Sequence, residues 1–315
     1  MRRAVLIANP SASQFTGGLF RQVVASLSPH FDLETQWPVS GRETLRQTRE
    51  IADDGIDVVF AMGGDGVAHH VANGLVGSHT ALGVIPAGTT NVLARILGVP
   101  LNPRKAAAAA GTYSALPTRV AHVVADTDVG HIDMYATFSV GLGFDAAVVE
   151  AAEKRPYAKL RFGGVYYATT AVGRLTHDWR AKLANIRIEA DGEGFDAVAA
   201  LTQVHSPYTY FGRVPLHITK DSTEGLATIG VTGLGLPNAA EILTRAVLRR
   251  EHSQRSGTRI WKDYERLTMT VDPPAPLQAD GELLGTASNV TIEPVEDGFT
   301  VLRPRTAEAE EPAEK

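Results

Sequence analysis

Three turns that follow apolar segments are the parts of this sequence best suited to phosphate chemistry. The clearest is Gly63-Gly64-Asp65-Gly66, which follows the apolar residues 58–62 and precedes a helical pattern. Backbone N–H groups and the dipole at such a helix N-terminus attract anions, and the missing Cβ atoms let a phosphate approach closely. Asp65 could orient a metal–nucleotide complex or accept a proton. Taken alone, these four residues fit a plain strand-to-helix turn equally well.

The two other turns also follow apolar segments. Asn9 to Ser13 follows Val5–Ala8, and Pro86 to Asn91 follows Leu82–Ile85. Continuous apolar runs bounded by turn residues are typical of strands buried on both faces of a parallel sheet. The carboxyl ends of such strands meet at one sheet edge, where open α/β sheets bind ligands. The spacing therefore predicts one site built from all three turns.

The elements that position these turns change in character near residue 120. Before it, helical segments such as 19–27 alternate with the apolar strands, which predicts a doubly wound α/β lobe. After it, short alternating strands predict an antiparallel, sandwich-like, β-rich lobe with helices near 146–153 and 239–249. Residues 306–315 are acidic and rich in alanine and proline, so we expect a disordered tail.

Composition excludes several classes of protein. The 315 residues are 44% hydrophobic, which suffices for a core and excludes wholesale disorder. The chain has no cysteine, which excludes disulfides, thiol nucleophiles and Cys-ligated metals. A net charge of −5 argues against nucleic-acid binding. We find no signal peptide and no apolar run of membrane-spanning length, so we expect a cytoplasmic protein.

An ordered set of motifs resembles the lipid kinases that comprise soluble bacterial diacylglycerol kinases, sphingosine kinases and ceramide kinases. Order and spacing agree from residue 4 to about 305. The motifs are Asn9-Pro10, Gly63-Gly64-Asp65-Gly66, Asn73-Gly74-Leu75, Pro86-Ala87-Gly88-Thr89-Thr90-Asn91, Gly141-Leu142-Gly143-Phe144-Asp145-Ala146 and Gln278-Ala279-Asp280-Gly281-Glu282.

This resemblance implies an ATP-dependent lipid kinase with the fold shared by diacylglycerol kinases and NAD kinases. The first lobe would comprise residues 1–122, rejoined by about 296–305, and the lipid-binding lobe residues 123–295. The favoured reaction converts diacylglycerol to phosphatidic acid, as in phospholipid biosynthesis, with Mg²⁺ carried by ATP. The lipid would be drawn from a membrane surface, and a peripheral position at the inner membrane stays open, as does the oligomeric state.

The resemblance also assigns roles to residues. Asp65 and Glu282 would be catalytic, with Glu282 as the general base, and Asp145 would orient the lipid head group. Arg155 and Arg161, in a basic and aromatic stretch, would contact nucleotide phosphates or an anionic membrane. The nucleotide-binding set as a whole is Asn9, Pro10, Ser11, Ala12, Ser13, Ser40, Gly63, Gly64, Asp65, Gly66, Val67, Gly88, Thr89, Asn91, Arg155 and Arg161.

Departures from the family pattern leave alternatives open. Val67 replaces a threonine, His70 a glutamate, and Val92 the aspartate of bacterial diacylglycerol kinases. Sphingosine kinases also lack this threonine and this aspartate, so another lipid substrate is an alternative. A non-catalytic nucleotide-binding regulator is a second. An NAD kinase-like enzyme is a third, although NAD kinases lack the Gln-x-Asp-Gly-Glu element. A structural magnesium site near Asp221–Glu224 stays open.

Some patterns have two interpretations. Asp-Gly-Glu occurs at Asp191 and again at Asp280, and either copy could be a hairpin turn. Because the second follows Gln278, we place the catalytic base there and expect Glu193 at an exposed hairpin tip. The segment 141–146 also fits a dinucleotide fingerprint but lacks the acidic residue expected about 20 positions later. For His69 and its neighbour His70 we expect solvated helix positions rather than a metal pair.

Overall fold

The computed structural model describes residues 1–153, 185–219, 225–233, 235–250 and 257–305. It contains two compact units, Met1–Thr118 with Asp297–Lys315, and Arg119–Glu296. The chain passes from the first unit to the second within strand β5 (Ser114–Thr127), and returns within strand β16 (Glu282–Arg303). The predicted boundary between residues 122 and 123 falls inside β5.

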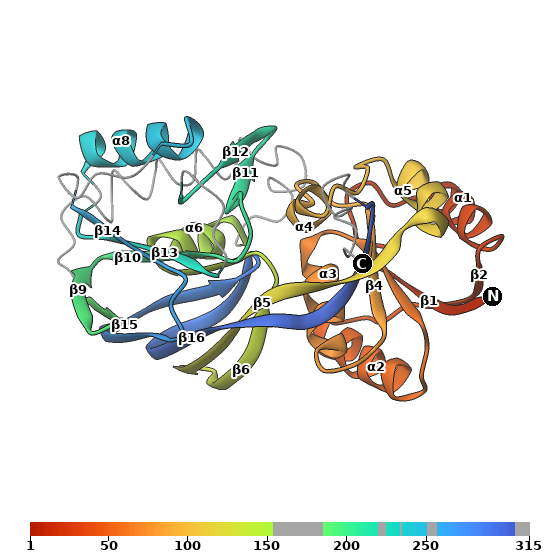
Figure 1. Cartoon of the computed structure of the whole chain (residues 1–315), viewed down its shortest axis with the longest axis horizontal. Coiled ribbons are helices and arrows are strands. Elements are labelled where there is room, and N and C mark those ends of the chain that lie inside the picture. The colour runs from red at the N-terminus through yellow and green to blue at the C-terminus, as the bar shows by residue number, and fades with distance from the viewer. Residues whose placement is uncertain (154–184, 220–224, 234, 251–256, 306–315) are drawn as a thin grey trace, which may run out of the picture. The chain divides into compact units, whose positions relative to one another are not determined.

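The first unit is a doubly wound α/β structure. Its parallel sheet has the order β2-β1-β3-β4, and the end of β16 adds to β4 with Thr300 opposite Ala81. Figure 1 shows α1 and α5 on one face of this sheet and α2 and α3 on the other. The elements are β1 (Arg2–Ala8), α1 (Gly17–Leu27), β2 (Phe31–Gln36), α2 (Gly41–Asp53), β3 (Val58–Gly63), α3 (Asp65–Leu75), β4 (Ala81–Pro86), α4 (Val92–Ile96), α5 (Pro103–Ala109) and the 3₁₀ turn η1 (Ala110–Thr112).

Central strands of this sheet are buried along their whole length. Every residue of β3 and of β4 is buried, as expected for strands covered on both faces by helices. Close packing requires a glycine at position 83, because an added Cβ there would collide with the ring of Phe60 on the neighbouring strand. The register that pairs Phe60 with Gly83 therefore depends on the absence of a side chain at position 83.

The second unit is mainly antiparallel. Its central strand β15 pairs with β16 along one side and, on the other, first with β8 and then with β7. Strands β7, β10, β13 and β14 follow in that order. The elements are β5 (Ser114–Thr127), β6 (Gly130–Ala136), β7 (Ser139–Gly143), α6 (Phe144–Glu153), β8 (Ile186–Ala190), β9 (Glu193–Ala197), β10 (Ala199–Gln203), β11 (Thr209–Phe211), β12 (Val214–Leu216), β13 (Ala227–Val231), α8 (Leu236–Val247), β14 (Thr258–Lys262), β15 (Leu267–Ala279) and β16 (Glu282–Arg303).

Both units agree with the fold class that the sequence predicts. Strand β9 ends at Ala197 and β10 starts at Ala199, so residues 195–201 are divided between two strands. Strand β9 pairs with β8, whereas β10 pairs with β7 and β13, so the break lets the chain change partners.

We expect Gly83→Ala to lower the free energy of unfolding by about 1–3 kcal/mol, because the added methyl group overpacks the contact with Phe60. Gly18→Ala is the matched control, since a Cβ added to Gly18 in α1 would meet only Thr16 Oγ1 at 3.9 Å, an ordinary contact, and alanine favours helix. Urea unfolding of both variants would measure the difference. Equal midpoints for Gly83→Ala and the parent chain would contradict the packing argument.

Candidate functional site

The three predicted turns lie together at one edge of the first sheet. Strands β1, β3 and β4 are neighbours in the sheet, and all three run in the same direction. Hydrogen bonds between backbone groups join the turns. The Ala87 N–H donates to the Gly63 carbonyl at 2.7 Å, and the Gln14 N–H donates to the Ala87 carbonyl at 3.0 Å. Asn9 N–H likewise donates to the Met62 carbonyl at 3.0 Å. The turns therefore form one connected rim.

Two glycines bring the β3 and β4 turns into direct backbone contact. A Cβ added to Gly88 would lie 2.5 Å from the Cα of Gly64, so position 88 has no room for a side chain. A Cβ added to Gly63 would lie 2.6 Å from Cγ2 of Val67. Bare backbone at the start of α3 is suited to phosphate, because its N–H groups can be approached closely.

Asn91 holds the β4 turn in shape. It adopts the left-handed conformation (φ 51°, ψ 56°) and is buried. Its side-chain amide donates to the Gly88 carbonyl at 2.9 Å, and its Oδ1 accepts from Gly88 N–H at 3.0 Å. The Gln14 amide reaches the same carbonyl at 2.7 Å. Asn91 thus holds the β4 turn through two hydrogen bonds to the backbone of Gly88.

The β1 turn presents small polar groups. Asn9 Oδ1 accepts from Ser11 N–H at 2.9 Å, and Asn9 O accepts from Ala12 N–H at 3.2 Å. Thr89 Oγ1, from the β4 turn, lies 3.3 Å from Ser13 Oγ, and both side chains are exposed. These hydroxyls are accessible donors at the rim.

Asp65 is the first residue of α3 and lies at the start of a second helix. Its Oδ1 accepts from Leu93 N–H of α4 at 3.2 Å. The side chain is partly exposed. A carboxylate fixed at this position fits a Mg²⁺ ion that also binds nucleotide phosphates, since Mg²⁺ often takes one or two carboxylates together with phosphates and water. In the described part of the chain, no group of three or more His, Cys, Asp or Glu residues could hold a metal by itself.

The histidines beside this turn are not solvated, so that expectation was wrong. His69 is buried in α3, and His70 is partly buried with its ring 5.3 Å from that of His69. Burial, together with the charge of His69, lowers the pKa of His70 to about 4. His70 is therefore neutral at physiological pH. Its ring packs against Gly41, next to Ser40, whose Oγ caps α2 by accepting from Glu43 N–H at 3.2 Å.

A second polar cluster lies within the other unit. Asp145, at the start of α6, accepts through Oδ2 from the Tyr208 hydroxyl at 2.7 Å and from the Gln278 amide at 2.8 Å. Gln278 Nε2 also lies 3.3 Å from the Tyr208 oxygen. An added Cβ at Gly141 would collide with Asp145 and Gln278, so the glycine of this motif makes room for the pair. The three side chains come from α6, β15 and the segment before β11.

The environment of this cluster changes how its members ionise. Burial raises the pKa of Asp145, and hydrogen bonds from Tyr208 and Gln278 oppose that shift by stabilising the carboxylate. Burial and the nearby negative charge of Asp145 raise the pKa of Tyr208 well above its usual value, so its hydroxyl stays a donor. Two neutral donors therefore fix the position of the Asp145 carboxyl group.

The turn before Glu282 is anchored by a buried carboxylate. Asp280 and Gly281 both have positive φ, at 52° and 82°, as in a two-residue type I′ hairpin between β15 and β16. Asp280 is 3% exposed and accepts from the backbone N–H groups of Thr137, Phe138 and Ser139 at 2.7, 2.8 and 3.1 Å. Gln278 Oε1 accepts from Gly281 N–H at 2.7 Å.

The other Asp-Gly-Glu segment has the same backbone but a different environment. Asp191 and Gly192 also have positive φ, at 53° and 76°, in the β8–β9 hairpin. Here Asp191, Gly192 and Glu193 are all exposed, and Glu193 forms an ion pair with Arg259. Only the second copy is tied to another strand by its aspartate, which holds Glu282, the first residue of β16, in a defined place.

Sequence reasoning missed several residues that shape these clusters. Tyr208 has no motif around it, and Gln14 follows a turn whose family pattern ends earlier. Asp280 and Gln278 were visible only as parts of a motif, without a role. Arg155 and Arg161, and the segment Asp221–Glu224, lie outside the described residues.

Comparison with known proteins agrees with these motifs. Residues 3–123 match the family model of the diacylglycerol kinase catalytic domain. The chain is 25% identical to a diacylglycerol kinase of Bacillus subtilis over 90% of this chain and 91% of that one. It spans about half the length of several other curated relatives.

Solved structures show the same fold. A diacylglycerol kinase from Bacillus anthracis superposes with a TM-score of 0.70 at 21% identity, over 96% of this chain and 97% of that chain. Yeast NADH kinase, solved with NADH, superposes with a TM-score of 0.53 at 10% identity, over 98% of this chain and 85% of that chain. The two-unit architecture is thus common to both groups.

We expect Asp280→Asn to lower the free energy of unfolding by about 1–3 kcal/mol or more, because an amide NH₂ would face backbone donors in a buried site. Asp191→Asn is the control, since it changes the same residue in the same turn conformation at the surface, where asparagine is well tolerated. Thermal unfolding of the two variants would compare them. A similar loss at both positions would show that the Asp280 bonds add no stability.

Proposed function

We propose that this chain transfers the γ-phosphoryl group of ATP to a primary hydroxyl of a lipid. The match of residues 3–123 to the diacylglycerol kinase catalytic domain supports this proposal, as does the similarity to the Bacillus subtilis diacylglycerol kinase. Diacylglycerol is the first candidate acceptor, and phosphatidic acid would be the product. The observation that carries this proposal is the pair of glycine turns in backbone contact at Gly64 and Gly88, beside the anchored carboxylate of Asp65.

The first unit would bind the nucleotide. Backbone N–H groups at the start of α3 would bind phosphate, and the exposed hydroxyls of Ser11, Ser13 and Thr89 would add donors. Phosphoryl transfer depends mainly on positioning and charge neutralisation, which a rigid rim of turns is suited to supply. Mg²⁺ bound with ATP would neutralise charge on the phosphates, and Asp65 would help to hold it.

The second unit would act on the lipid. Glu282 would take the proton from the lipid hydroxyl. The oxygen of that hydroxyl would form a bond to the γ-phosphorus, while the bond from this phosphorus to the bridging oxygen of the departing ADP breaks. Asp145, fixed by Tyr208 and Gln278, would accept a hydrogen bond from the lipid head group. Asp280 would act through the backbone, by keeping Glu282 at the start of β16.

A second lipid acceptor is favoured by one observation. Val67 packs beside Gly63, and Val92 is buried at the start of α4, so neither position supplies the hydroxyl or carboxylate of the bacterial diacylglycerol kinase pattern. A sphingosine-like amino alcohol is therefore the alternative acceptor. Likeness to NADH kinase extends to the fold alone.

Transfer of radiolabelled phosphate from ATP separates these candidates. The full chain would be incubated with micellar diacylglycerol, with sphingosine and with NAD in parallel, with Mg²⁺ present. We expect labelled phosphatidic acid. Label found only in NADP would overturn the proposal, and ATP binding without transfer to any lipid would favour a non-catalytic regulator.

We expect Asp65→Asn to reduce turnover by about 10²-fold or more while the fold survives, because the amide oxygen can still accept from Leu93 N–H but carries no charge for a metal-bound phosphate. The measurements are turnover at saturating ATP and thermal unfolding of the same sample. Turnover within a few-fold of the parent chain, with unchanged unfolding, would remove Asp65 from the machinery.

We expect Glu282→Gln to reduce turnover by about 10²-fold or more, the usual scale for loss of a general base, with little change in ATP affinity. Glu193→Gln provides the matched control. Glu193 follows an Asp-Gly turn of the same conformation, but it is exposed and forms an ion pair with Arg259. Its turnover should stay near that of the parent chain. Equal turnover in the two variants would place the base elsewhere.

A further inference from the structure

Exposed apolar side chains concentrate on two neighbouring elements of the second unit. Leu243, Val247 and Leu248 on α8 and at its C-terminal end are 53%, 39% and 52% exposed. Phe211 and Val214, at the tip of the β11–β12 hairpin, are 41% and 40% exposed. Half of the large exposed hydrophobic side chains in the described part of the chain therefore lie on this short stretch of surface, which we call the α8–hairpin face.

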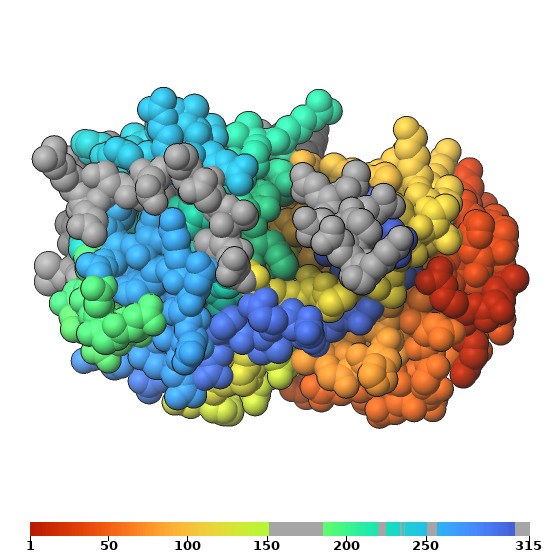
Figure 2. All heavy atoms as spheres, in the orientation of Figure 1, coloured from red at the N-terminus to blue at the C-terminus, as the bar shows by residue number. Residues whose placement is uncertain are grey.

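The two elements of this face are packed against each other. His217 N–H, just after β12, donates to the Ala246 carbonyl of α8 at 3.0 Å. Figure 1 shows α8 and the hairpin side by side on the second unit, and Figure 2 shows both at its surface. None of the helices in the described ranges is long and apolar enough to cross a membrane. A face of this kind would contact a surface without spanning a bilayer.

Arginines border the apolar side chains. Arg213 lies exposed at the hairpin tip, and Arg249 and Arg250 are exposed where α8 ends. Arg249 has a φ of 51°, and Arg250 N–H donates to the Arg245 carbonyl at 2.9 Å, a helix-ending geometry that fixes where these residues leave α8. Residues 209–216 and 236–250 together contain four arginines and one glutamate, whereas the whole chain has a net charge of −5.

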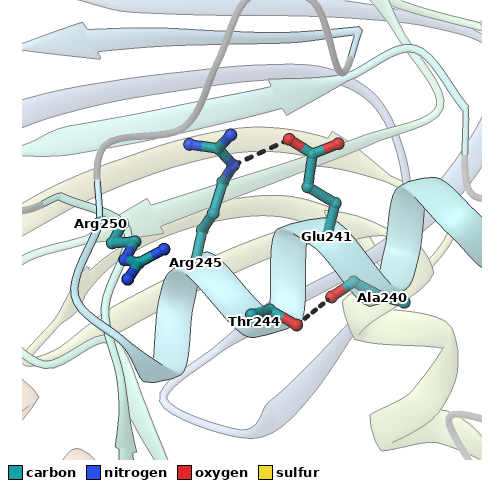
Figure 3. Close-up of a pocket in the computed structure, with 5 residues that line it drawn as sticks. All are labelled: Ala240, Glu241, Thr244, Arg245 and Arg250. Atoms are coloured by element: carbon teal, nitrogen blue, oxygen red, sulfur yellow. Dashed lines mark hydrogen bonds and ion pairs between the residues drawn. The ribbon is translucent and has the colours of Figure 1, made fainter.

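A shallow groove runs between two of these arginines. It has a volume of about 360 Å³ and is lined by Ala240, Glu241, Thr244, Arg245 and Arg250. Figure 3 shows Arg245 directed toward Glu241, which it pairs with at 2.8 Å, and Arg250 on the other side of Arg245. The groove is open and has two arginines in its lining, so it suits a phosphate group presented at a surface better than an enclosed apolar ligand.

The same hairpin leads directly to the candidate lipid site. Tyr208, the residue before β11, donates its hydroxyl to Asp145, and its N–H to the Leu216 carbonyl at the end of β12 at 2.9 Å. A surface bound at the hairpin tip would therefore be joined, within one unit, to the residue proposed to orient the lipid head group.

We propose that the α8–hairpin face docks the protein on an anionic lipid bilayer. The exposed side chains of Leu243, Leu248 and Phe211 enter the boundary between head groups and acyl chains, and the bordering arginines bind lipid phosphates. Charge favours this occupant over a second copy of the chain, because an excess of arginine is attracted to an anionic surface. This inference rests on the proposed function, since the lipid must be drawn from a membrane.

Vesicle sedimentation tests the docking face without using kinase activity. The full chain would be mixed with phosphatidylcholine vesicles with and without phosphatidylglycerol, at low and high salt. We expect binding that requires phosphatidylglycerol and weakens with salt. Leu243→Ser with Leu248→Ser should weaken it about tenfold or more. Arg249→Gln with Arg250→Gln should weaken it about fivefold for each arginine removed.

Matched controls come from exposed positions elsewhere. Leu101→Ser with Val129→Ser removes two exposed apolar side chains, and Arg104→Gln with Lys105→Gln removes an adjacent basic pair. Both control variants should sediment like the parent chain. Equal binding by all variants, or none by the parent chain, would overturn the proposal. Loss of a dimer on size-exclusion chromatography in the α8 variants, without vesicle binding by the parent chain, would assign the face to a second copy.

A short-chain diacylglycerol dissolved as monomers separates this proposal from the proposed function. The α8 variants should phosphorylate it as fast as the parent chain, because no surface is involved. If the parent chain binds vesicles through this face but labels no lipid, the kinase proposal fails and the docking face stands. If the parent chain labels lipid but the α8 variants bind vesicles unchanged, the docking face fails and the kinase proposal stands.

Discussion

The backbone contact between Gly64 and Gly88 is the constraint on which the first unit depends. It requires strands β3 and β4 to be adjacent, parallel and of matched length, since both turns must leave the sheet at the same edge. It also requires glycine at position 88, where an added Cβ would lie 2.5 Å from the Cα of Gly64. The same contact leaves the start of α3 bare and places Asp65 against the start of α4. Sheet packing and phosphate chemistry are thus met by one arrangement.

The arrangement of the strands in the second unit depends on polar groups that are buried among them. Asp280 ties the β15–β16 hairpin to the start of β7, and Gln278 links the same hairpin to Asp145. Buried polar groups of this kind are costly when unpaired, so a satisfied set selects one arrangement of the strands. The position of Glu282 follows from these bonds, and Tyr208, the residue before the β11–β12 hairpin, completes the cluster.

Much of the fold could be predicted because its signals are local. Buried central strands such as β3 and β4 are continuous apolar runs, and the turns after them are marked by glycine and asparagine. The edge strand β2 was missed, because its half-exposed residues show neither a continuous run nor a clean alternation. His69 was misjudged for a similar reason: its burial is set by elements that pack on α3, which no short window of sequence contains.

By itself, the sequence determined the fold class, the three turns and the ordered motifs that resemble those of lipid kinases. These depend on residue type and spacing, which can be read from short segments of the sequence. Only the tertiary structure decided which Asp-Gly-Glu segment is anchored, because Asp191 and Asp280 share one backbone conformation and differ only in what surrounds them. The same holds for Asp145, Tyr208 and Gln278, which lie far apart in the chain. Burial and hydrogen-bond partners come from distant segments, and so only folding brings them together.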